Sequence, residues 1–600
     1  MQAATSTDAG RGTGSRTIAD LLPLAAERYG DDVAARYKRD GTWHDITFHE
    51  VGEGVSEIGR GLIDLGLQPG DRICILCNTR PEWTSADFAC SAAGLTVVPV
   101  YPTNSPEECE YLIADSEAKA IICEDASQVE KITAVRDRVP TLEHVIAIDP
   151  DGVPDGVLAM ADLRARGRDR DPAELTQRSA AVKPEDPFTF IYTSGTTGPP
   201  KGCVLTHGNY RSVLDMCIDL RIFGDDNEDE VAYLYLPLAH SYALLIQLLS
   251  FDLGSTIAYF GGDTKQIIAE LNEVRPTQLP SVPRIFEKIY TLVTSNVDAE
   301  TMAKATEVGT KVQDLRTAGQ EVPAELLAAY DQFDEKLFKN VRQAFGGRLR
   351  QASTGAAPIA TEILEFFWAC GVPVMEGYGM TETATVATTQ TVAHHRFGSV
   401  GAPLPGVEVK IAEDGEVLVK GANIFRGYHG NQDASFGAIA DGFLHTGDLG
   451  SLDEDGFLHI TGRKKDIIIT AGGKNLTPAN LENDMKQTRW VSQAMMHGDR
   501  RPYPVMLITL DEEEMAAWAA QNGIADASPA ALAREPRVIA LIQDELDKAN
   551  AKYAQVERVK KFFILDHDLT QETGELTPTL KVKRNVVNEK YAEDFDRLYG

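Results

Sequence analysis

Several marks of secreted, fibrous or low-complexity proteins are missing from this sequence. Its 600 residues include only 8 cysteines, with 50 glycines and 29 prolines. So few cysteines do not make a disulfide framework, and we expect a reducing, cytoplasmic setting. The Cys-x-x-Cys pair Cys74 and Cys77 lies in a strand-like apolar stretch without a second pair to complete a zinc site. The glycine and proline content excludes collagen-like and low-complexity classes.

Basic residues are also scarce relative to acidic ones. The chain has 58 Lys and Arg against 90 Asp and Glu, a formal net charge of −32. Such a surface repels phosphate backbones, so we expect no nucleic-acid partner, although one pocket can reverse the field locally for a small anion. The same charge opposes docking on anionic lipid except through a local basic patch. Peripheral membrane contact and a homodimer both stay open.

The longest uncharged run does not fit a membrane span. Residues 231–251 carry no charge and are about long enough to cross a bilayer. Pro237 and His240 interrupt the run, and its pattern favours a buried strand, a loop and a buried helix. At the N-terminus, residues 1–18 lack the apolar core of a signal peptide and predict a disordered tail.

What the sequence does contain is a long alternation of strand and helix patterns. Short apolar strands such as RICIL and LTVVPV are separated by helical stretches, which is typical of βαβ units and a parallel sheet. From about residue 398, short strands rich in Gly and Asp indicate an antiparallel β subdomain. The sequence therefore predicts an α/β protein. Residues 19–462 form a large N-terminal domain with parallel or mixed α/β subdomains and a β subdomain, and residues 463–600 form a small α+β domain.

Local patterns predict individual elements. Asp40-Gly41 between alternating segments indicates a β-hairpin, and Thr47 with Glu50 forms a capping box for the helix that follows. Between residues 283 and 346 the chain becomes helical and charged. An apolar stripe there, ending at Phe345, predicts packing in the core and not a membrane-binding face.

The segment FIYTSGTTGPPKG, residues 190–202, carries the strongest chemical signal. A strand leads into small hydroxylated residues and glycines, and Lys201 follows. Gly195 and Gly198 let backbone N–H groups converge on an anion, while hydroxyl groups and a lysine add donors and charge. It is not a Walker A loop, because Pro200 stands where that motif needs glycine. The composition predicts a polyphosphate cradle.

YTSGTTGPPKG resembles the phosphate-loop signature of the acyl-adenylate-forming (AMP-binding) superfamily. That superfamily includes acyl-CoA synthetases, luciferases and peptide-synthetase adenylation domains. Further motifs resemble it in the same order, over roughly residues 20–595. They are STGAAP (353–358), EGYGMTET (376–383), HTGD (445–448), GRKKDIIITAGGKNLTP (462–478) and LTPTLKVKR (576–584).

The resemblance implies a nucleotide site. Tyr378 would stack on adenine, Thr381 would bond a phosphate, and Asp448 with Arg463 would hold the ribose. Glu382 would hold Mg²⁺, which suits a carboxylate oxygen. The residues implied to bind nucleotide are Thr193, Ser194, Gly195, Thr196, Thr197, Gly198, Lys201, Gly355, Ala356, Ala357, Glu376, Gly377, Tyr378, Gly379, Thr381, Asp448, Arg463 and Lys474.

The resemblance also implies that Lys581 is catalytic, together with Glu382 and Thr193. The family usually has glycine before this lysine, and Leu580 departs from that pattern. Lys583 is the nearest rival, but Lys581 keeps the family's spacing to Arg584.

The implied reaction has two halves, with Mg²⁺ as cofactor and ATP and CoA as co-substrates. A carboxylate attacks the α-phosphorus of ATP to give acyl-AMP and pyrophosphate, and a thiol then displaces AMP. The family uses two poses of its C-terminal domain, a mobile lid that rotates about a hinge matching Lys465. Gly472 and Gly473 would enter the thiol channel in the second pose.

The acid and the thiol acceptor are less sharply defined. PLAHSYALL (237–245) resembles the loop before the family's acyl pocket, with His240 at the carboxylate end. The helical insertion resembles the long-chain acyl-CoA synthetase branch, which implies a long-chain fatty acid as substrate. Alternatives stay open: a ligase that loads an acyl carrier protein, a medium-chain or aryl acid CoA ligase, or a catalytically silent nucleotide-binding scaffold.

Overall fold

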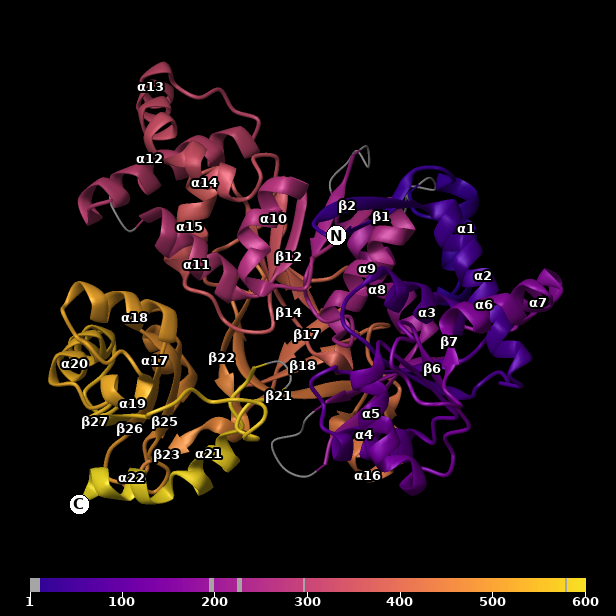
Figure 1. Cartoon of the computed structure of the whole chain (residues 1–600). Helices are drawn as coiled ribbons and strands as arrows, with labels where there is room; N and C mark the ends of the chain where they lie inside the picture. The colour runs from indigo at the N-terminus through magenta and orange to yellow at the C-terminus, as the bar shows by residue number, and fades with distance from the viewer. Residues whose placement is uncertain (1–10, 194–198, 224–228, 295–296, 578–579) are drawn as a thin grey trace.

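The protein consists of a large N-terminal body and a smaller C-terminal domain. The computed structural model describes residues 11–193, 199–223, 229–294, 297–577 and 580–600. Two large sheets, one of nine strands and one of eight, form the body with an antiparallel β subdomain. The C-terminal domain has a separate three-stranded sheet and is seen in orange and yellow at the lower left of Figure 1. This arrangement is the predicted α/β fold class.

The eight-stranded sheet is mainly parallel and is built from βαβ units, as the alternating pattern predicted. Its order is β19-β9-β8-β4-β3-β5-β6-β7, so the next two strands after β3 pair with it on opposite sides. Loops at the carboxyl ends of such strands are the usual place for ligand sites. The strands are β3 (Arg72–Leu76), β4 (Thr96–Val100), β5 (Ala120–Cys123), β6 (His144–Ala147), β7 (Leu158–Ala159), β8 (Pro187–Thr193), β9 (Lys201–Thr206) and β19 (Gly427–Tyr428).

The nine-stranded sheet joins distant parts of the chain. The predicted hairpin β1–β2 is confirmed, and β1 pairs in parallel with β11, where Ala35 faces Ile257. The strands, in sheet order, are β16 (Ala402–Pro403), β15 (Thr388–Thr389), β14 (Val374–Tyr378), β13 (Gln351–Thr354), β12 (Gln278–Ser281), β10 (Val231–Leu234), β11 (Thr256–Tyr259), β1 (Val33–Arg39) and β2 (Thr42–Thr47).

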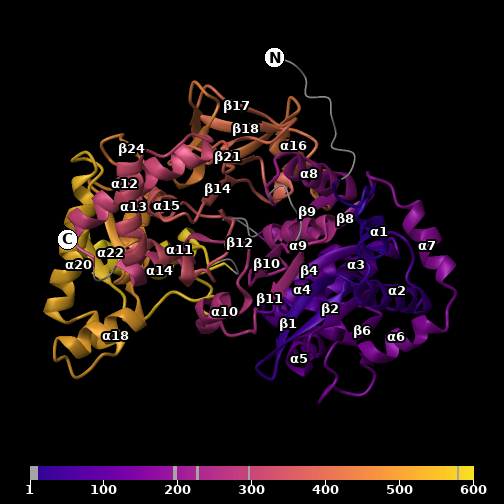
Figure 2. The same ribbon diagram turned by 90° about the horizontal axis from the view of Figure 1, so that it is seen from above.

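Helices cover both sheets of the body, as the views in Figures 1 and 2 show. The capping box is confirmed: Thr47 Oγ1 accepts from Glu50 N at 3.2 Å, and Glu50 Oε2 accepts from Thr47 N at 2.8 Å. The helices are α1 (Ile18–Tyr29), α2 (Phe48–Asp64), α3 (Pro81–Ala92), α4 (Pro106–Ser116), α5 (Ala126–Val135), α6 (Met160–Arg168), α7 (Pro172–Ala181), α8 (His207–Asp219), α9 (Ser241–Leu253), α10 (Ile267–Val274), α15 (Thr361–Ala369) and α16 (Gln432–Ala438).

The uncharged run 231–251 forms strand β10, a loop and helix α9, as predicted. Almost every residue of α9 is buried, which explains its apolar composition without a membrane. Within the described residues, the structure contains no helix with the length and hydropathy that a bilayer span requires.

The helical insertion packs its apolar stripe inward, as predicted. It contains α11 (Pro283–Thr294), α12 (Ala299–Thr317), α13 (Ala324–Phe333) and α14 (Lys339–Ala344), with a π-helical stretch, Asp334–Phe338, between the last two. Tyr330, Val341 and Phe345 are buried in one hydrophobic core with Phe286 and Phe367.

The β subdomain and the C-terminal domain follow in chain order. The antiparallel subdomain is confirmed and contains β17 (Glu408–Ile411), β18 (Glu416–Lys420), β20 (Ile439–Ala440), β21 (Phe443–Leu452) and β22 (Leu458–Arg463). A short helical turn, Lys464–Asp466, leads out of β22. The C-terminal domain comprises β23 (Ile468–Ile469), β24 (Asn475–Leu476), α17 (Pro478–Lys486), β25 (Val491–His497), β26 (Val505–Leu510), α18 (Glu512–Gln521), α19 (Pro529–Leu532), α20 (Pro536–Ala551), β27 (Lys561–Ile564), α21 (Arg584–Lys590) and α22 (Ala592–Tyr599).

The described part of the predicted N-terminal tail is held against the body. Thr13 donates to Asp252 Oδ1 from its backbone N at 2.9 Å and from its hydroxyl at 2.5 Å. Asp252 is buried at the end of α9 and also pairs with Arg211 at 2.6 Å. Helix α1 then begins at Ile18. The expectation of a disordered tail up to residue 18 is therefore corrected for residues 11–18, and residues 1–10 lie outside the described residues.

Candidate functional site

A buried carboxylate joins two of the predicted motifs. Tyr378 ends strand β14, and its hydroxyl donates to Asp448 Oδ2 at 2.7 Å. Arg463 Nε donates to the other oxygen, Oδ1, at 2.7 Å. Asp448 and Arg463 are direct partners in the β21–β22 ladder, so the sheet itself places this ion pair. The structure thus brings these three predicted residues together.

Asp448 contributes to shifted pKa values of both of its partners in this trio. Desolvation and then the negative charge of Asp448 raise the pKa of the Tyr378 hydroxyl. Desolvation opposes the charged form of Arg463, but the attraction of Asp448 outweighs it and raises the guanidinium pKa. Asp448 therefore sits as a buried acceptor between two fixed donors, with lone pairs left for hydroxyl groups of a ligand.

Glycines next to this trio permit close backbone packing. Strands β13 and β14 run parallel, with Thr354 opposite Glu376, so the segments that follow them meet at one edge. A Cβ on Gly355 would lie 3.1 Å from the carbonyl oxygen of Gly377. A Cβ on Gly379 would lie only 2.1 Å from the carbonyl oxygen of Thr385, which excludes any side chain there.

Other predicted residues lie on the same edge. Ala356 and Ala357 are exposed beside Gly355, and Thr381 is buried just after Gly379. Glu376 is buried in β14, and burial raises its pKa to about 8.

A second group of residues connects Glu382 to the predicted phosphate-binding segment, residues 190–202. Glu382 is buried, and the Tyr428 hydroxyl donates to its Oε1 at 2.7 Å. Lys201 Nζ lies 5.2 Å from the centroid of the Tyr428 ring. Tyr428 reaches both because β19 pairs with β9, where it faces Cys203. Desolvation, followed by the charge of Glu382, raises the pKa of Tyr428.

Thr193 and the residues after it belong to this group. Thr193 is the last residue of β8 and faces Lys201 across the β8–β9 ladder. Ser194, Gly195, Thr196, Thr197 and Gly198 lie outside the described residues.

The residues at Glu382 fit a magnesium ion that is shared with a substrate. Among the residues that the structure describes, no three His, Cys, Asp or Glu side chains gather into a metal cluster. Mg²⁺ is commonly held by one or two carboxylates, while phosphates and waters supply the remaining oxygens. Glu382, which Tyr428 orients through Oε1, would supply one such carboxylate.

Lys581 reaches toward the Asp448 trio from the C-terminal domain. Its side chain is exposed to solvent, but protein surrounds much of it. Desolvation, followed by the nearby charge of Arg463, lowers the pKa of Lys581; Asp448 acts in the opposite direction and Lys465 lowers the pKa further. An ammonium group is therefore held near a buried carboxylate and a guanidinium contributed by the body.

The charge of Lys581 also acts on His240 of the body. His240 is the N-cap residue of helix α9, and its Nδ1 accepts from Tyr242 N at 3.2 Å. Desolvation first, and the charge of Lys581 second, lower the pKa of His240 to about 4. Its imidazole is accordingly neutral at physiological pH. The apolar helix α9 leads away from it into the core.

Lys583 and Arg584 lie beside Lys581 but have other surroundings. The backbone N of Lys583 donates to Glu575 O at 2.8 Å, inside the C-terminal domain. The Arg584 guanidinium donates to Glu482 of α17 and, at 3.3 Å, to Met496 O. Arg584 therefore fastens the segment that carries Lys581 to its own domain.

Contacts between the domains hold Lys581 in this position. Arg284 of α11 donates to Asp511 Oδ2, ahead of α18, at 2.5 Å. Both views show α11 next to the C-terminal domain. At the predicted hinge, Lys465 is exposed, and desolvation and then the charge of Arg463 lower its pKa. Lys464 pairs with Glu416 of β18 at 3.1 Å.

The structure does not bring the turn 471–474 to the Asp448 trio. Gly472, Gly473 and Lys474 are exposed, and Lys474 O accepts from Thr470 N at 3.0 Å within the same turn. Ala471 N donates to Arg501 O of the C-terminal domain. In this pose Lys581 faces the body, while the turn packs on its own domain.

Tyr428 contacts predicted site residues, and the sequence did not identify it. Its hydroxyl donates to Glu382 and Lys201 lies over its ring, yet it comes from a strand of two residues. So short a strand has no periodicity, and its partner lies more than 200 residues earlier in the chain. No signal in a single sequence could have linked these positions.

Leu580 stands where the resembled family usually has glycine, and the backbone conformation at this position explains that preference for glycine. Its φ is +59°, in the left-handed region that favours glycine, and its side chain is 60% exposed. Non-glycine residues bear a cost of roughly 1–2 kcal/mol there. We expect Leu580→Gly to keep the stability of the protein within about 1 kcal/mol and to keep the pyrophosphate release that the resemblance implies at or above the original rate.

The matched variant is Leu580→Val, because a β-branched residue is a genuine outlier at positive φ. It should displace Lys581 and slow the implied pyrophosphate release roughly tenfold, with little change in melting temperature. Equal rates for the glycine and valine variants would show that this backbone conformation does not position the lysine.

Two family sequence models match nearly the whole chain. The model described as AMP-binding enzyme matches residues 22–429, and that of the AMP-binding enzyme C-terminal domain matches residues 465–600. A protein of Mycobacterium tuberculosis named long-chain-fatty-acid–CoA ligase FadD15 is 40% identical over 567 residues, 94% of this chain and 93% of that protein. A Xenopus laevis protein named long-chain-fatty-acid–CoA ligase ACSBG2 is 33% identical, over 97% of this chain and 84% of its own length.

Solved structures share the fold. The anthranilate CoA ligase AuaEII in complex with anthranoyl-AMP aligns with a TM-score of 0.72 at 19% identity, covering 96% of this chain and 97% of that one. A Mycobacterium tuberculosis fatty acyl CoA synthetase aligns with a TM-score of 0.62 at 20% identity, covering 96% and 99%. Both likenesses support the fold class predicted from the sequence.

Proposed function

The chain belongs to the AMP-binding enzyme family, and on that premise we propose that it activates a long-chain fatty acid with ATP and transfers the acyl group to CoA. In the first half, a carboxylate oxygen attacks the α-phosphorus of ATP. The bond from that phosphorus to the bridging oxygen breaks, and acyl-AMP and pyrophosphate form. In the second half, the thiol of CoA attacks the acyl carbon, and AMP leaves with the former carboxylate oxygen.

One observation carries the proposal: Lys581 of the C-terminal domain lies near enough to the Tyr378–Asp448–Arg463 trio of the body for Asp448 and Arg463 to shift its pKa. Asp448 would accept the ribose hydroxyls, which fixes the nucleotide. Lys581 would then place a positive charge against the oxygens on which negative charge gathers during attack. Catalysis of this kind depends on positioning and electrostatic stabilisation.

We assign the metal role to Glu382. A bound Mg²⁺ would neutralise phosphate oxygens of ATP, which is the chemistry that such an ion supplies. Tyr428 orients the Glu382 carboxylate through its hydrogen bond, and Lys201 adds positive charge on the same side. These residues together suit the polyphosphate end of the nucleotide.

We assign the acyl carboxylate to the space beside His240. Its neutral imidazole faces Lys581, and the apolar helix α9 begins at this point. The long-chain preference rests on the names of the relatives FadD15 and ACSBG2. We also propose a cytoplasmic setting, supported by eight buried free cysteines.

The test is pyrophosphate release by the purified protein with ATP, Mg²⁺ and palmitate. We expect release only when the fatty acid is present, and stoichiometric acyl-CoA when CoA is added. The same reaction with acyl carrier protein in place of CoA is the matched comparison. Acyl transfer to the carrier protein without any acyl-CoA would overturn the choice of acceptor. No release with any fatty acid would overturn the proposed activity.

A further inference from the structure

One buried hydroxyl connects the two large sheets at the edge where the site lies. Thr79 lies in the loop between β3 and α3 and is only 8% exposed. Its Oγ1 donates to Leu236 O at 2.8 Å and accepts from Leu238 N at 3.0 Å. Strand β3 belongs to the eight-stranded sheet, whereas Leu236 and Leu238 follow β10 of the nine-stranded sheet. A single threonine therefore satisfies two backbone groups of a loop 157 residues away.

The loop that Thr79 holds ends at His240. Leu236 and Leu238 are buried, and His240 N donates to Pro237 O at 2.9 Å. The path of the backbone into helix α9 is thus set by this turn and by the Thr79 hydroxyl. His240 is two residues beyond Leu238, the second Thr79 contact.

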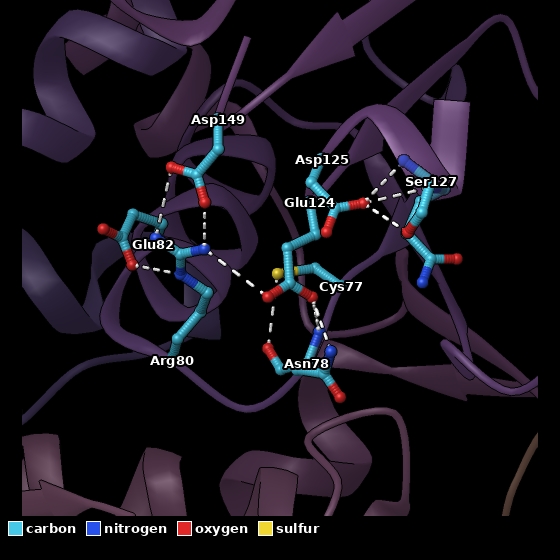
Figure 3. A network of polar contacts seen from close by, with 9 residues as sticks. Cys77, Asn78, Arg80, Glu82, Glu124, Asp125, Ser127 and Asp149 are labelled. Atoms are coloured by element: carbon cyan, nitrogen blue, oxygen red, sulfur yellow. Dashed lines mark hydrogen bonds and ion pairs between the residues drawn. The ribbon is translucent and has the colours of Figure 1, made fainter. Parts of the chain in front are cut away.

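Polar contacts fix the residues on both sides of Thr79, as Figure 3 shows. Asn78 donates to Glu124 Oε2 from its backbone N at 2.8 Å and from its side chain at 2.7 Å. Arg80 donates to Asp149 Oδ2 at 2.6 Å and to Glu82 Oε2 at 2.7 Å.

Glu124 and Asp149 follow strands β5 and β6, so this network anchors the loop to the parallel sheet. Thr79 lies between Asn78 and Arg80 and bonds to the other sheet. The contacts of Asn78 and Arg80 fix the loop to the parallel sheet. The Thr79 hydroxyl then fixes residues 236–240 relative to that loop.

We propose that Thr79 is a positioning residue for the acyl substrate, because its hydroxyl holds the loop that ends at His240. The inference rests on the proposed function, in which the acyl carboxylate lies beside His240. The Asp448 trio, which would hold the nucleotide, comes from other strands. Loss of the Thr79 hydroxyl should therefore weaken use of the acid and spare use of ATP.

The test is steady-state pyrophosphate release by the full-length protein with palmitate and ATP varied in turn. Thr79→Val keeps the side-chain shape but leaves a buried carbonyl and a buried N–H without their partner. We expect kcat/KM for palmitate to fall about tenfold. The KM for ATP should stay within about twofold of the original value, because the Thr79 contacts do not include the nucleotide site. Thr79→Ser keeps the hydroxyl and should restore most of the acid kinetics.

A matched control is Thr96→Val. Thr96 is also buried, and its hydroxyl donates to Pro187 O at 3.1 Å, in β8 and away from the 236–240 loop. It should leave both kcat/KM for palmitate and the KM for ATP unchanged. Melting temperatures of all variants report any general loss of stability.

A second variant covers the case in which Thr79→Val does not fold. Arg80→Gln removes the partially exposed anchor behind Thr79, and we expect a roughly threefold loss in kcat/KM for palmitate with an unchanged KM for ATP. The inference would be overturned if the loss in kcat/KM for palmitate came with an equal rise in the KM for ATP. It would also be overturned if Thr79→Val kept the original kcat/KM for palmitate. An inactive wild-type protein would instead refute the proposed function, which keeps the two failures distinct.

Discussion

Lys581→Ala should slow adenylate formation by a factor of roughly 10²–10³. The lysine is the cation that the C-terminal domain places beside the Asp448 trio, and alanine leaves no charge against the oxygens of the reacting phosphate. Thioester formation from supplied acyl-AMP and CoA should continue, because the α-phosphorus is not attacked in that half. The measurement is the rate of each half-reaction, followed separately by pyrophosphate release and by acyl-CoA formation.

Lys583→Ala is the matched control, since it removes a lysine two residues away. The described hydrogen bonds of Lys583 are backbone bonds within its own domain: its N donates to Glu575 O, and its O accepts from Val587 N. We expect less than about a threefold change in either half-reaction. Full adenylate formation by Lys581→Ala, or an equal loss in Lys583→Ala, would show that the wrong lysine has been assigned.

The same assignment predicts a pH dependence. The pKa of Lys581 is lowered from its ordinary value by desolvation, then by Arg463 and Lys465, while Asp448 partly opposes them. The active form is the charged one, which exists below the pKa. Adenylate formation should therefore decline as the pH rises through a value below the ordinary lysine pKa of about 10.4. Lys581→Arg should move that decline to higher pH. His240, with its pKa of about 4, stays neutral throughout that range.

Asp448→Asn should raise the KM for ATP roughly a hundredfold. The carboxylate now accepts from Tyr378 and Arg463 and keeps lone pairs for two ribose hydroxyls. Hydrogen bonds to a charged group contribute about 1.5–3 kcal/mol each, and the amide also leaves the Arg463 charge without its partner. The measurement is the KM for ATP in pyrophosphate release at saturating fatty acid.

Two comparisons make this prediction specific to the ribose. The wild-type enzyme should use 3′-deoxy-ATP about tenfold less efficiently than ATP, whereas Asp448→Asn should discriminate little between them. Tyr378→Phe removes only one donor to Asp448 and should raise the KM for ATP by no more than about fivefold. If Asp448→Asn kept the original preference for ATP over 3′-deoxy-ATP, its carboxylate would not be the ribose acceptor.

The parts of the fold that could be predicted from the sequence are those coded by neighbouring residues. The Asp40-Gly41 hairpin, the Thr47–Glu50 capping box and the buried helix in the run 231–251 each depend on a short local pattern. The site residues were found because they stand in motifs, and the structure brings Tyr378 and Asp448 into contact.

The rest depends on pairing between distant segments. Tyr428 contacts Glu382 only because a two-residue strand joins β9, and Thr79 contacts Leu236 only because two sheets meet. Neither partner could be identified from a single sequence, since the choice among many buried segments is made by the packing of the whole body. The prediction of disorder for residues 11–18 was wrong for a related reason: Thr13 binds Asp252, more than 200 residues away.

The most direct test of the account follows one oxygen atom. The enzyme would be incubated with ATP, Mg²⁺, CoA and palmitate labelled with ¹⁸O in both carboxylate positions, and the AMP formed would be analysed by mass spectrometry. If the carboxylate attacks the α-phosphorus and the thiol then attacks the acyl carbon, each AMP carries one ¹⁸O atom. Unlabelled AMP would contradict an acyl-adenylate intermediate, and so would ADP and phosphate in place of AMP and pyrophosphate.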